Sequence, residues 1–214
     1  MLSNKGAAST VVPVSRLRRP HPAPTAGPRS VATRMLHASM LLAVLYQLIG
    51  SQFLSRPIPG EAPEFNMVVH QYVGLACMAL VLVFWLWTLI RRGETKLGRL
   101  LPWLSPTRTR AVLNDVRDQM SHILRGEVPV EADGAMASAI HGLGLLTVTA
   151  MAITGTVYFI VDGGAGTRTI LSLHKLLSNL MWVYLVGHAA MALLHHLLGS
   201  DILSRMFWHR HGHL

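Results

Sequence analysis

LHKLLSNLMWVYLVGHAAMALLHHLL, residues Leu173–Leu198, decides the fold, because it is apolar, long enough to cross a bilayer, and carries two histidines inside it. His174 and His188 are close to four helical turns apart, so both imidazoles leave one face of a helix, displaced by about 21 Å along its axis. Histidine is costly in hydrocarbon and usually faces a bundle interior as a ligand or proton carrier. The stripe predicts two stacked cofactor sites, with simple polar contacts to neighbouring helices as the alternative.

The composition is that of an integral membrane protein. Of the 214 residues, 51% are hydrophobic and only 14% charged, and the mean hydropathy of +0.40 is too high for a soluble domain of this length. Four stretches reach the roughly 20 residues that a bilayer core requires: Met35–Leu54, Met67–Ile90, Met136–Val161 and Ser172–Leu198. The sequence therefore predicts an all-α, multi-pass four-helix bundle in the lipid bilayer, formed by a single domain over residues 34–206.

The net charge of +9 follows the predicted topology. Of the 19 basic residues, 14 lie either before the first span or between spans two and three. By the positive-inside rule, both termini and the 91–135 loop face the cytoplasm of a cell whose inner (plasma) membrane holds the protein. A charge distributed in this way does not form the basic patch of a nucleic-acid-binding protein, so no nucleic-acid partner is expected.

The segments outside the spans are basic. Residues 1–33 are predicted to form a disordered tail, with a mitochondrial transit peptide as the second interpretation because the stretch lacks amphipathic spacing. Residues 207–214 form a basic, histidine-rich tail. In the 91–135 loop, the Ser105-Pro106 pair and the apolar spacing up to Gly126 predict a short amphipathic helix. It lies on the cytoplasmic interface or, alternatively, docks another subunit.

Depth in the membrane sorts four histidines into two pairs. His37 opens the first span near the inner surface, the level that His188 reaches, whereas His70 and His174 both lie near the outer surface. Ligation by two imidazoles, which leaves the metal no open coordination position, suits haem electron transfer better than hydrolytic zinc, which needs a free position. Arg34, one turn before His37, is placed to pair with a haem propionate. An equally good interpretation makes Arg34 a positive-inside anchor.

Three other residues bear on the cofactor. Gly74 follows His70 by one turn on the same face and would let a flat macrocycle approach the backbone, although glycine is also common where membrane helices pack. Cys77 is the only cysteine, which excludes a C-x-x-C-H motif for covalent haem attachment. His141 lies at the depth of His37. It could compete for the inner cofactor, line a quinone pocket or bond a propionate, and its spacing favours a role other than ligand.

Four motifs together resemble a known family: Thr33-Arg34-Met35-Leu36-His37, His70-x-x-x-Gly74, the His174 and His188 spacing, and the His195–Met206 ending of the form HH…D..L.RM. Over roughly Arg34–Met206 the chain resembles the bacterial cytochrome b561 family and related cytochrome b subunits of hydrogenases and other dehydrogenases. The resemblance implies two non-covalent haem b groups and electron exchange with quinone or quinol. Ala38 stands where the family often has Trp, and the 91–135 loop is longer than in compact members.

Three functions are consistent with the sequence. The first is a di-haem, quinone-linked oxidoreductase working alone, as a monomer or homodimer. The second is the haem-bearing membrane anchor of a larger complex with a redox partner subunit. The third is a haem-free transporter or structural membrane protein, which is disfavoured because all ten acidic residues lie outside the predicted spans.

Overall fold

The computed structural model describes residues 29–55, 62–91, 94–125, 134–161 and 166–197, together with Leu203 and Met206. Within these residues every regular element is helical. The elements are α1 (Val31–Gly50), η2 (Ser51–Phe53), α2 (Phe65–Ile90), α3 (Leu97–Leu100), η3 (Pro102–Leu104), α4 (Pro106–Leu124), α5 (Ala135–Val161) and α6 (Thr167–Leu197). Four of them, α1 with η2, α2, α5 and α6, are long and apolar enough to cross a membrane, which confirms the predicted fold class.

Two spans begin about one turn earlier than predicted, α6 at Thr167 rather than Ser172 and α1 at Val31 rather than Met35. Ser30 caps α1 by accepting a hydrogen bond at Oγ from the backbone N–H of Thr33 (3.2 Å). Residues 31–33 were expected in the disordered tail but belong to the first span, and Thr33 is buried. The rest of that tail and the 207–214 tail lie outside the described residues.

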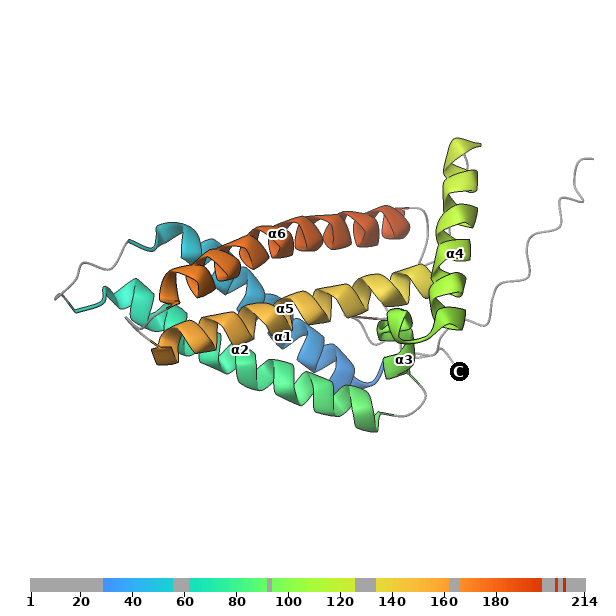
Figure 1. The fold of residues 1–214 in the computed structure, drawn as a ribbon. Coiled ribbons are helices and arrows are strands. Elements are labelled where there is room, and N and C mark those ends of the chain that lie inside the picture. The colour runs from blue at the N-terminus through green and yellow to red at the C-terminus, as the bar shows by residue number, and fades with distance from the viewer. Residues whose placement is uncertain are drawn as a thin grey trace, which may run out of the picture.

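The four long helices run side by side, with α5 between α2 and α6 and with α1 packed on α2 (Figure 1). All four contribute to one buried core, formed by Val44, Leu48, Val81, Leu145, Val148, Ala152 and Met181. Most other apolar side chains face outward; Leu42 and Val183, for example, are 68% and 71% exposed. Helices that are hydrophobic all round need an apolar solvent, which the bilayer provides.

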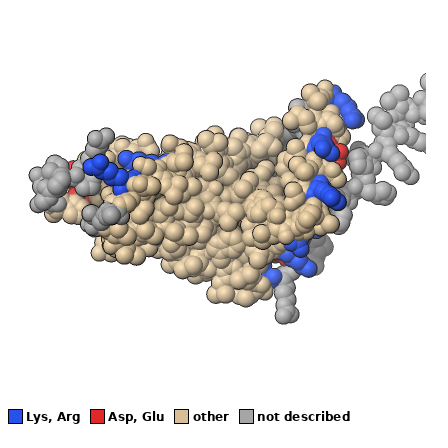
Figure 2. Space-filling view, viewed as in Figure 1, with Lys and Arg blue, Asp and Glu red and all other residues tan. Residues whose placement is uncertain are grey.

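Charged side chains gather at the two ends of the molecule, and a long uncharged stretch separates them (Figure 2). The end that holds the start of α1, the end of α2, α3 and α4 is called here the inner end, and the opposite end, with η2 and the start of α2, the outer end. An uncharged belt between two charged ends is the pattern that a membrane-embedded bundle requires.

α6 is the least enclosed of the spans. It packs along α5, but its contacts with α1 and α2 are sparse, and Met181 is its only buried residue among those described. His174, Met181 and His188 follow one another at seven-residue intervals and so share one face of α6. Met181 meets the core at mid-depth, and a histidine lies about 10 Å to either side of it along the helix.

The segment between α2 and α5 folds onto the inner end. α4, predicted from its cap and apolar spacing, runs across the bundle axis (Figure 1). Asp115 of α4 accepts a hydrogen bond at Oδ2 from the backbone N–H of Met136 (2.8 Å), which satisfies one donor at the start of α5. α3 and η3 were not predicted. Leu100 of α3 is buried against Gly142, where any side chain would overlap the Leu100 carbonyl oxygen.

Candidate functional site

Three histidines meet at the inner end. The ring centroids of His37 and His188 are 6.4 Å apart, with an angle of 53° between the ring planes. His141 lies edge-on to His188 at a centroid distance of 5.0 Å. The side chains come from α1, α5 and α6, so this contact joins helices that are distant in the sequence.

These distances distinguish the possible ligand pairs. An imidazole nitrogen lies about 2 Å from a metal that it binds and its ring centroid roughly 1 Å further, so two imidazoles on opposite sides of one metal have centroids roughly 6 Å apart. The separation of His37 and His188 matches this value. The shorter, edge-on contact of His141 with His188 does not.

His141 is oriented by its own helix. Its Nδ1 lies 2.6 Å from the carbonyl oxygen of Ala137, and since a carbonyl only accepts, Nδ1 carries the hydrogen and Nε2 has the lone pair. On the other side of the site, the Tyr184 ring stacks on His188 with 9° between the planes and 5.4 Å between the centroids. Gly144 makes room for Tyr184, because a side chain at this position would overlap the ring.

At the outer end, α5 orients His174. The hydroxyl of Thr154 donates to the carbonyl of Ala150 (2.8 Å), so its Oγ1 is an acceptor for the Nδ1–H of His174 at 3.0 Å. This leaves the Nε2 lone pair of His174 for a ligand, the usual arrangement of a metal-binding histidine. A Cβ at Gly155 would lie 3.1 Å from the imidazole, so glycine also lets α5 approach the ring closely.

His70 of α2 lies at the same end of the bundle as His174, since α2 begins at Phe65 and α6 at Thr167. The Nδ1 atoms of His70 and His37 are buried and have no hydrogen-bond partner among the described residues. Buried ring nitrogens without partners are uncommon in folded proteins and call for an explanation such as an absent ligand. Together with the sparse contact of α6 with α1 and α2, these atoms fit a flat cofactor held between the helices.

The other two predicted site residues lie close to the histidines. Arg34 is in the first turn of α1, three residues before His37 and on the same side of the helix. The position that a Cβ would take at Gly74 is 3.0 Å from Nε2 of Gln47. A side chain of α1 therefore packs against Gly74, and the approach of a macrocycle to this glycine stays a prediction.

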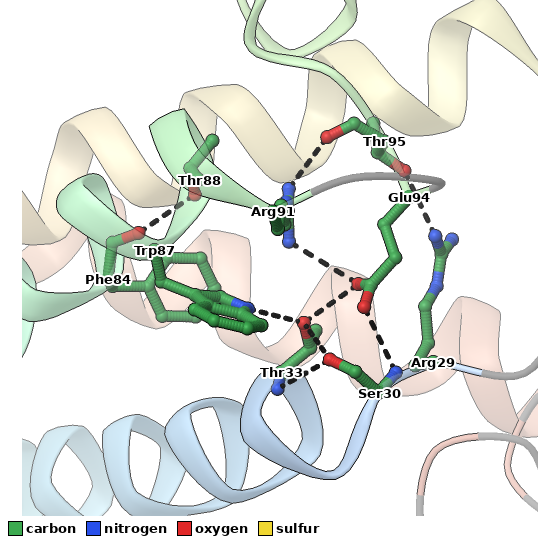
Figure 3. A network of polar contacts seen from close by, with 9 residues as sticks. All are labelled: Arg29, Ser30, Thr33, Phe84, Trp87, Thr88, Arg91, Glu94 and Thr95. Atoms are coloured by element: carbon green, nitrogen blue, oxygen red, sulfur yellow. Dashed lines mark hydrogen bonds and ion pairs between the residues drawn. The ribbon is translucent and has the colours of Figure 1, made fainter.

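A network of partly buried polar groups lies at the inner end, where the start of α1 meets the end of α2 (Figure 3). Its members are Arg29, Ser30, Thr33, Trp87, Arg91, Glu94 and Thr95. Glu94 accepts hydrogen bonds from the backbone N–H of Ser30 (3.0 Å) and the hydroxyl of Thr33 (2.7 Å) and pairs with Arg91 at 3.7 Å. Trp87 donates to the same hydroxyl of Thr33 at 2.8 Å. The network ties the start of α1 to the end of α2 one turn before His37.

The network also sets the charge of Glu94. Burial alone would raise the pKa of this carboxyl, but the hydrogen bonds from Ser30 and Thr33 and the positive charge of Arg91 outweigh burial and hold the pKa below its ordinary value of 4.5. A carboxyl with a depressed pKa stabilises the fold above its unfolded-state pKa, and this stabilisation is lost as the pH falls through the folded-state pKa.

Glu94→Gln should therefore destabilise the protein at neutral pH by about 3 kcal/mol, because it leaves Arg91 buried without its counter-charge. The measurement is thermal unfolding of the detergent-solubilised protein at pH 7 and at a pH well below 4.5, where the carboxyl of the unchanged protein is itself protonated and the difference should shrink. Glu64→Gln, which changes an exposed carboxylate before α2, is the control. Equal melting temperatures for both variants at pH 7 would contradict this account.

A shallow cavity of about 160 Å³ opens beside His70 at the outer end. Its lining comprises Tyr46, Gly50, Phe53, Asn66 and His70, from the end of α1, η2 and the start of α2. Tyr46 and Asn66 offer hydrogen-bonding groups there. This volume suits a ring-sized group rather than a macrocycle.

Sequence reasoning missed several residues that hold the histidines. Tyr184 precedes His188 by four residues and so shares its helix face, which is a signal that spacing could have provided. Thr154, Gly144 and Gly155 carried no comparable signal, because small residues in a membrane helix indicate close packing in general without naming a partner.

The comparisons with known proteins agree with the geometry. A model of the family described as prokaryotic cytochrome b561 matches residues 29–209, which includes all four long helices and every histidine discussed above. Neither the curated proteins nor the solved structures contain a significant match. Since the family match covers most of the 214 residues, this multi-pass membrane protein belongs to the prokaryotic cytochrome b561 family.

Proposed function

We propose that this membrane b-type cytochrome is a di-haem protein that carries electrons across the bilayer between a quinone or quinol and a second redox partner. His37 and His188 are the ligands of the inner haem iron, and His70 and His174 those of the outer. The observation that carries the proposal is the 6.4 Å separation of the His37 and His188 rings, together with the placement of His174 on the same face of α6.

The donor set supports haem rather than a bare metal ion. No group of three or more His, Cys, Asp or Glu side chains that could hold a metal ion occurs within the part of the chain that the structure describes. Two imidazoles alone leave an iron short of ligands, whereas a porphyrin supplies the remaining four nitrogens. With cysteine present only as Cys77, such a haem is held without a covalent bond.

In this proposal, residues of the chain bind the two haems, orient the histidine ligands and separate the two sites. Haem bound by two imidazoles has no open coordination position, so it supplies one-electron transfer rather than substrate activation. Thr154 fixes the tautomer of His174, and Tyr184 stacks on His188. Met181, packed with Val44, Leu48 and Val81, fills the bundle with apolar groups between the two levels.

The link to quinone is supported by the outer cavity. It opens beside His70 and presents Tyr46 and Asn66, whose side chains can bond the two oxygens of a quinone ring. The test is to add a quinol to the oxidised, purified protein and record a reduced-minus-oxidised spectrum. Sharp low-spin b-haem bands that develop with quinol support the proposal. A spectrum without haem bands would favour the haem-free transporter or structural protein.

A second candidate function is the haem-bearing anchor subunit of a larger complex. α4 favours it, because Leu113, Met120 and Leu124 form an apolar stripe that is 51%, 52% and 81% exposed. Copurification in mild detergent separates the candidates: a redox subunit retained with the cytochrome supports the anchor, and a monomer or homodimer with quinol activity supports the stand-alone enzyme.

We also propose that the protein lies in the inner (plasma) membrane with both termini and the 91–135 segment in the cytoplasm. The support is the 14 basic residues that lie before α1, in its first turn, or between α2 and α5. With this orientation, the inner end faces the cytoplasm and the cavity beside His70 faces the opposite side.

His141→Ala should leave both haems bound, because the ring of His141 is edge-on to His188 at a centroid distance of 5.0 Å, which is shorter than the separation of two imidazoles that bind one metal. The expected change is confined to the midpoint potential of the inner haem or to quinol turnover, since His141 adds a polar ring beside a ligand. Redox titration of the purified variant measures this. Loss of the inner haem in His141→Ala but not in His37→Ala would move the ligand from α1 to α5.

A further inference from the structure

Gln47 links α1 to the backbone of α2 inside the membrane. Its side-chain Nε2 donates a hydrogen bond to the carbonyl oxygen of His70 at 2.9 Å. Because a carbonyl oxygen only accepts, the amide orientation is fixed, and Oε1 is the end of the side chain that remains for another contact. A polar side chain at this depth is costly unless it serves a purpose.

Gly74 provides the room for this contact. In an α-helix the carbonyl of His70 already accepts the N–H of residue 74, so a second donor has to approach beside that bond. A Cβ at position 74 would lie 3.0 Å from Nε2 of Gln47, which is closer than side chains normally pack. The glycine one turn after His70 therefore lets the amide of Gln47 reach the backbone of α2.

Gln47 and His70 each carry a buried polar atom, and the two atoms are of complementary type. Oε1 of Gln47, an acceptor, and Nδ1 of His70 are both buried, and neither has a hydrogen-bond partner among the described residues. If Nε2 of His70 binds iron, Nδ1 carries the hydrogen and becomes a donor that needs an acceptor. His174, the partner of His70, already has an acceptor of this kind in Thr154.

We infer that Gln47 is the positioning residue for His70: once Nε2 of His70 binds iron, Oε1 of Gln47 accepts the Nδ1–H of the imidazole, a bond that the two atoms do not make in this structure, and holds the ring toward the outer haem. The inference rests on the proposed function, since it requires His70 to bind iron. A hydrogen bond to Nδ1–H makes the imidazole a more basic ligand, which favours the oxidised iron and lowers the midpoint potential.

The experiment is a redox titration of Gln47→Leu and Gln47→Glu, with haem content measured on the same samples. The outer component is identified beforehand as the one lost in His174→Ala. Gln47→Leu removes the acceptor and should raise the midpoint potential of the outer component while the inner one stays unchanged. Gln47→Glu keeps an acceptor oxygen, so the outer potential should stay at the original value or fall below it.

Gln52→Leu is the matched control, because among the described residues the hydrogen bonds of the Gln52 amide stay within its own segment, to Leu48 and Ser51. It should leave both potentials unchanged. Loss of the outer haem in Gln47→Leu, with retention in Gln47→Glu, also supports the inference. Identical outer potentials in the original protein and in Gln47→Leu would overturn it. If His174→Ala removes no haem at all, the ligand assignment itself fails, and the inference fails with it.

Discussion

His37→Ala and His188→Ala should each remove one haem, and both should remove the same one. The two imidazoles approach from α1 and α6 at a centroid distance of 6.4 Å, which is the separation expected for opposite ligands of one metal. Bis-imidazole iron that loses one imidazole no longer has its low-spin ligand set, so the haem content should fall by roughly half and one redox component should disappear.

The double variant makes the test sharper. If His37 and His188 serve one iron, replacing both should cost no more haem than replacing either, because residues that act as one unit are not additive. Haem content and redox titration of the purified variants provide the measurement. His122→Ala on α4 is the control and should keep both components. Different components lost in His37→Ala and His188→Ala would refute the inner pair.

His70→Ala and His174→Ala should abolish the second component and spare the first. About 21 Å of α6 separates His174 from His188, and buried Met181 lies between them, so neither imidazole can serve both irons. Combining His37→Ala with His174→Ala should remove both haems, since the two changes affect independent sites.

Loss of a haem in His174→Ala could also result from a folding defect, so a second variant that conserves side-chain shape tests the same site. Thr154→Val keeps the shape of the side chain but removes the acceptor for Nδ1–H of His174. It should retain the haem that His174→Ala loses and raise its midpoint potential, because the ligand becomes less basic. If the component lost in His70→Ala is instead the one lost in His37→Ala, the proposed pairing by depth is wrong.

The sequence predicted the four spans because each is an apolar run of spanning length, a signal that needs no knowledge of neighbours. α4 was predicted for a similar reason, since its Ser105-Pro106 start and apolar spacing are local. α3 was missed because four residues cannot show a helical period. Its position depends on Leu100 meeting Gly142, a contact between segments that are far apart in the sequence.

In the candidate site, too, local features could be predicted from the sequence, whereas features that depend on helix packing could not. Helical geometry alone placed His174 and His188 on one face of α6 and His37 at the depth of His188. The roles of Thr154 and Gln47 depend on which helix packs against which, and the sequence does not contain that information locally. The beginning of α1 was also placed too late, since Val31–Thr33 carry little apolar signal and are held by the network around Glu94.

The most direct test of the central claim is the number of haems per chain. The purified protein is assayed for haem and protein, extracted with acidified acetone, and titrated over its full redox range. The account predicts two haems per chain, complete extraction, and two components with different midpoint potentials, because the two sites differ in the groups around their histidines. One haem per chain, or haem that stays on the polypeptide after extraction, would contradict it.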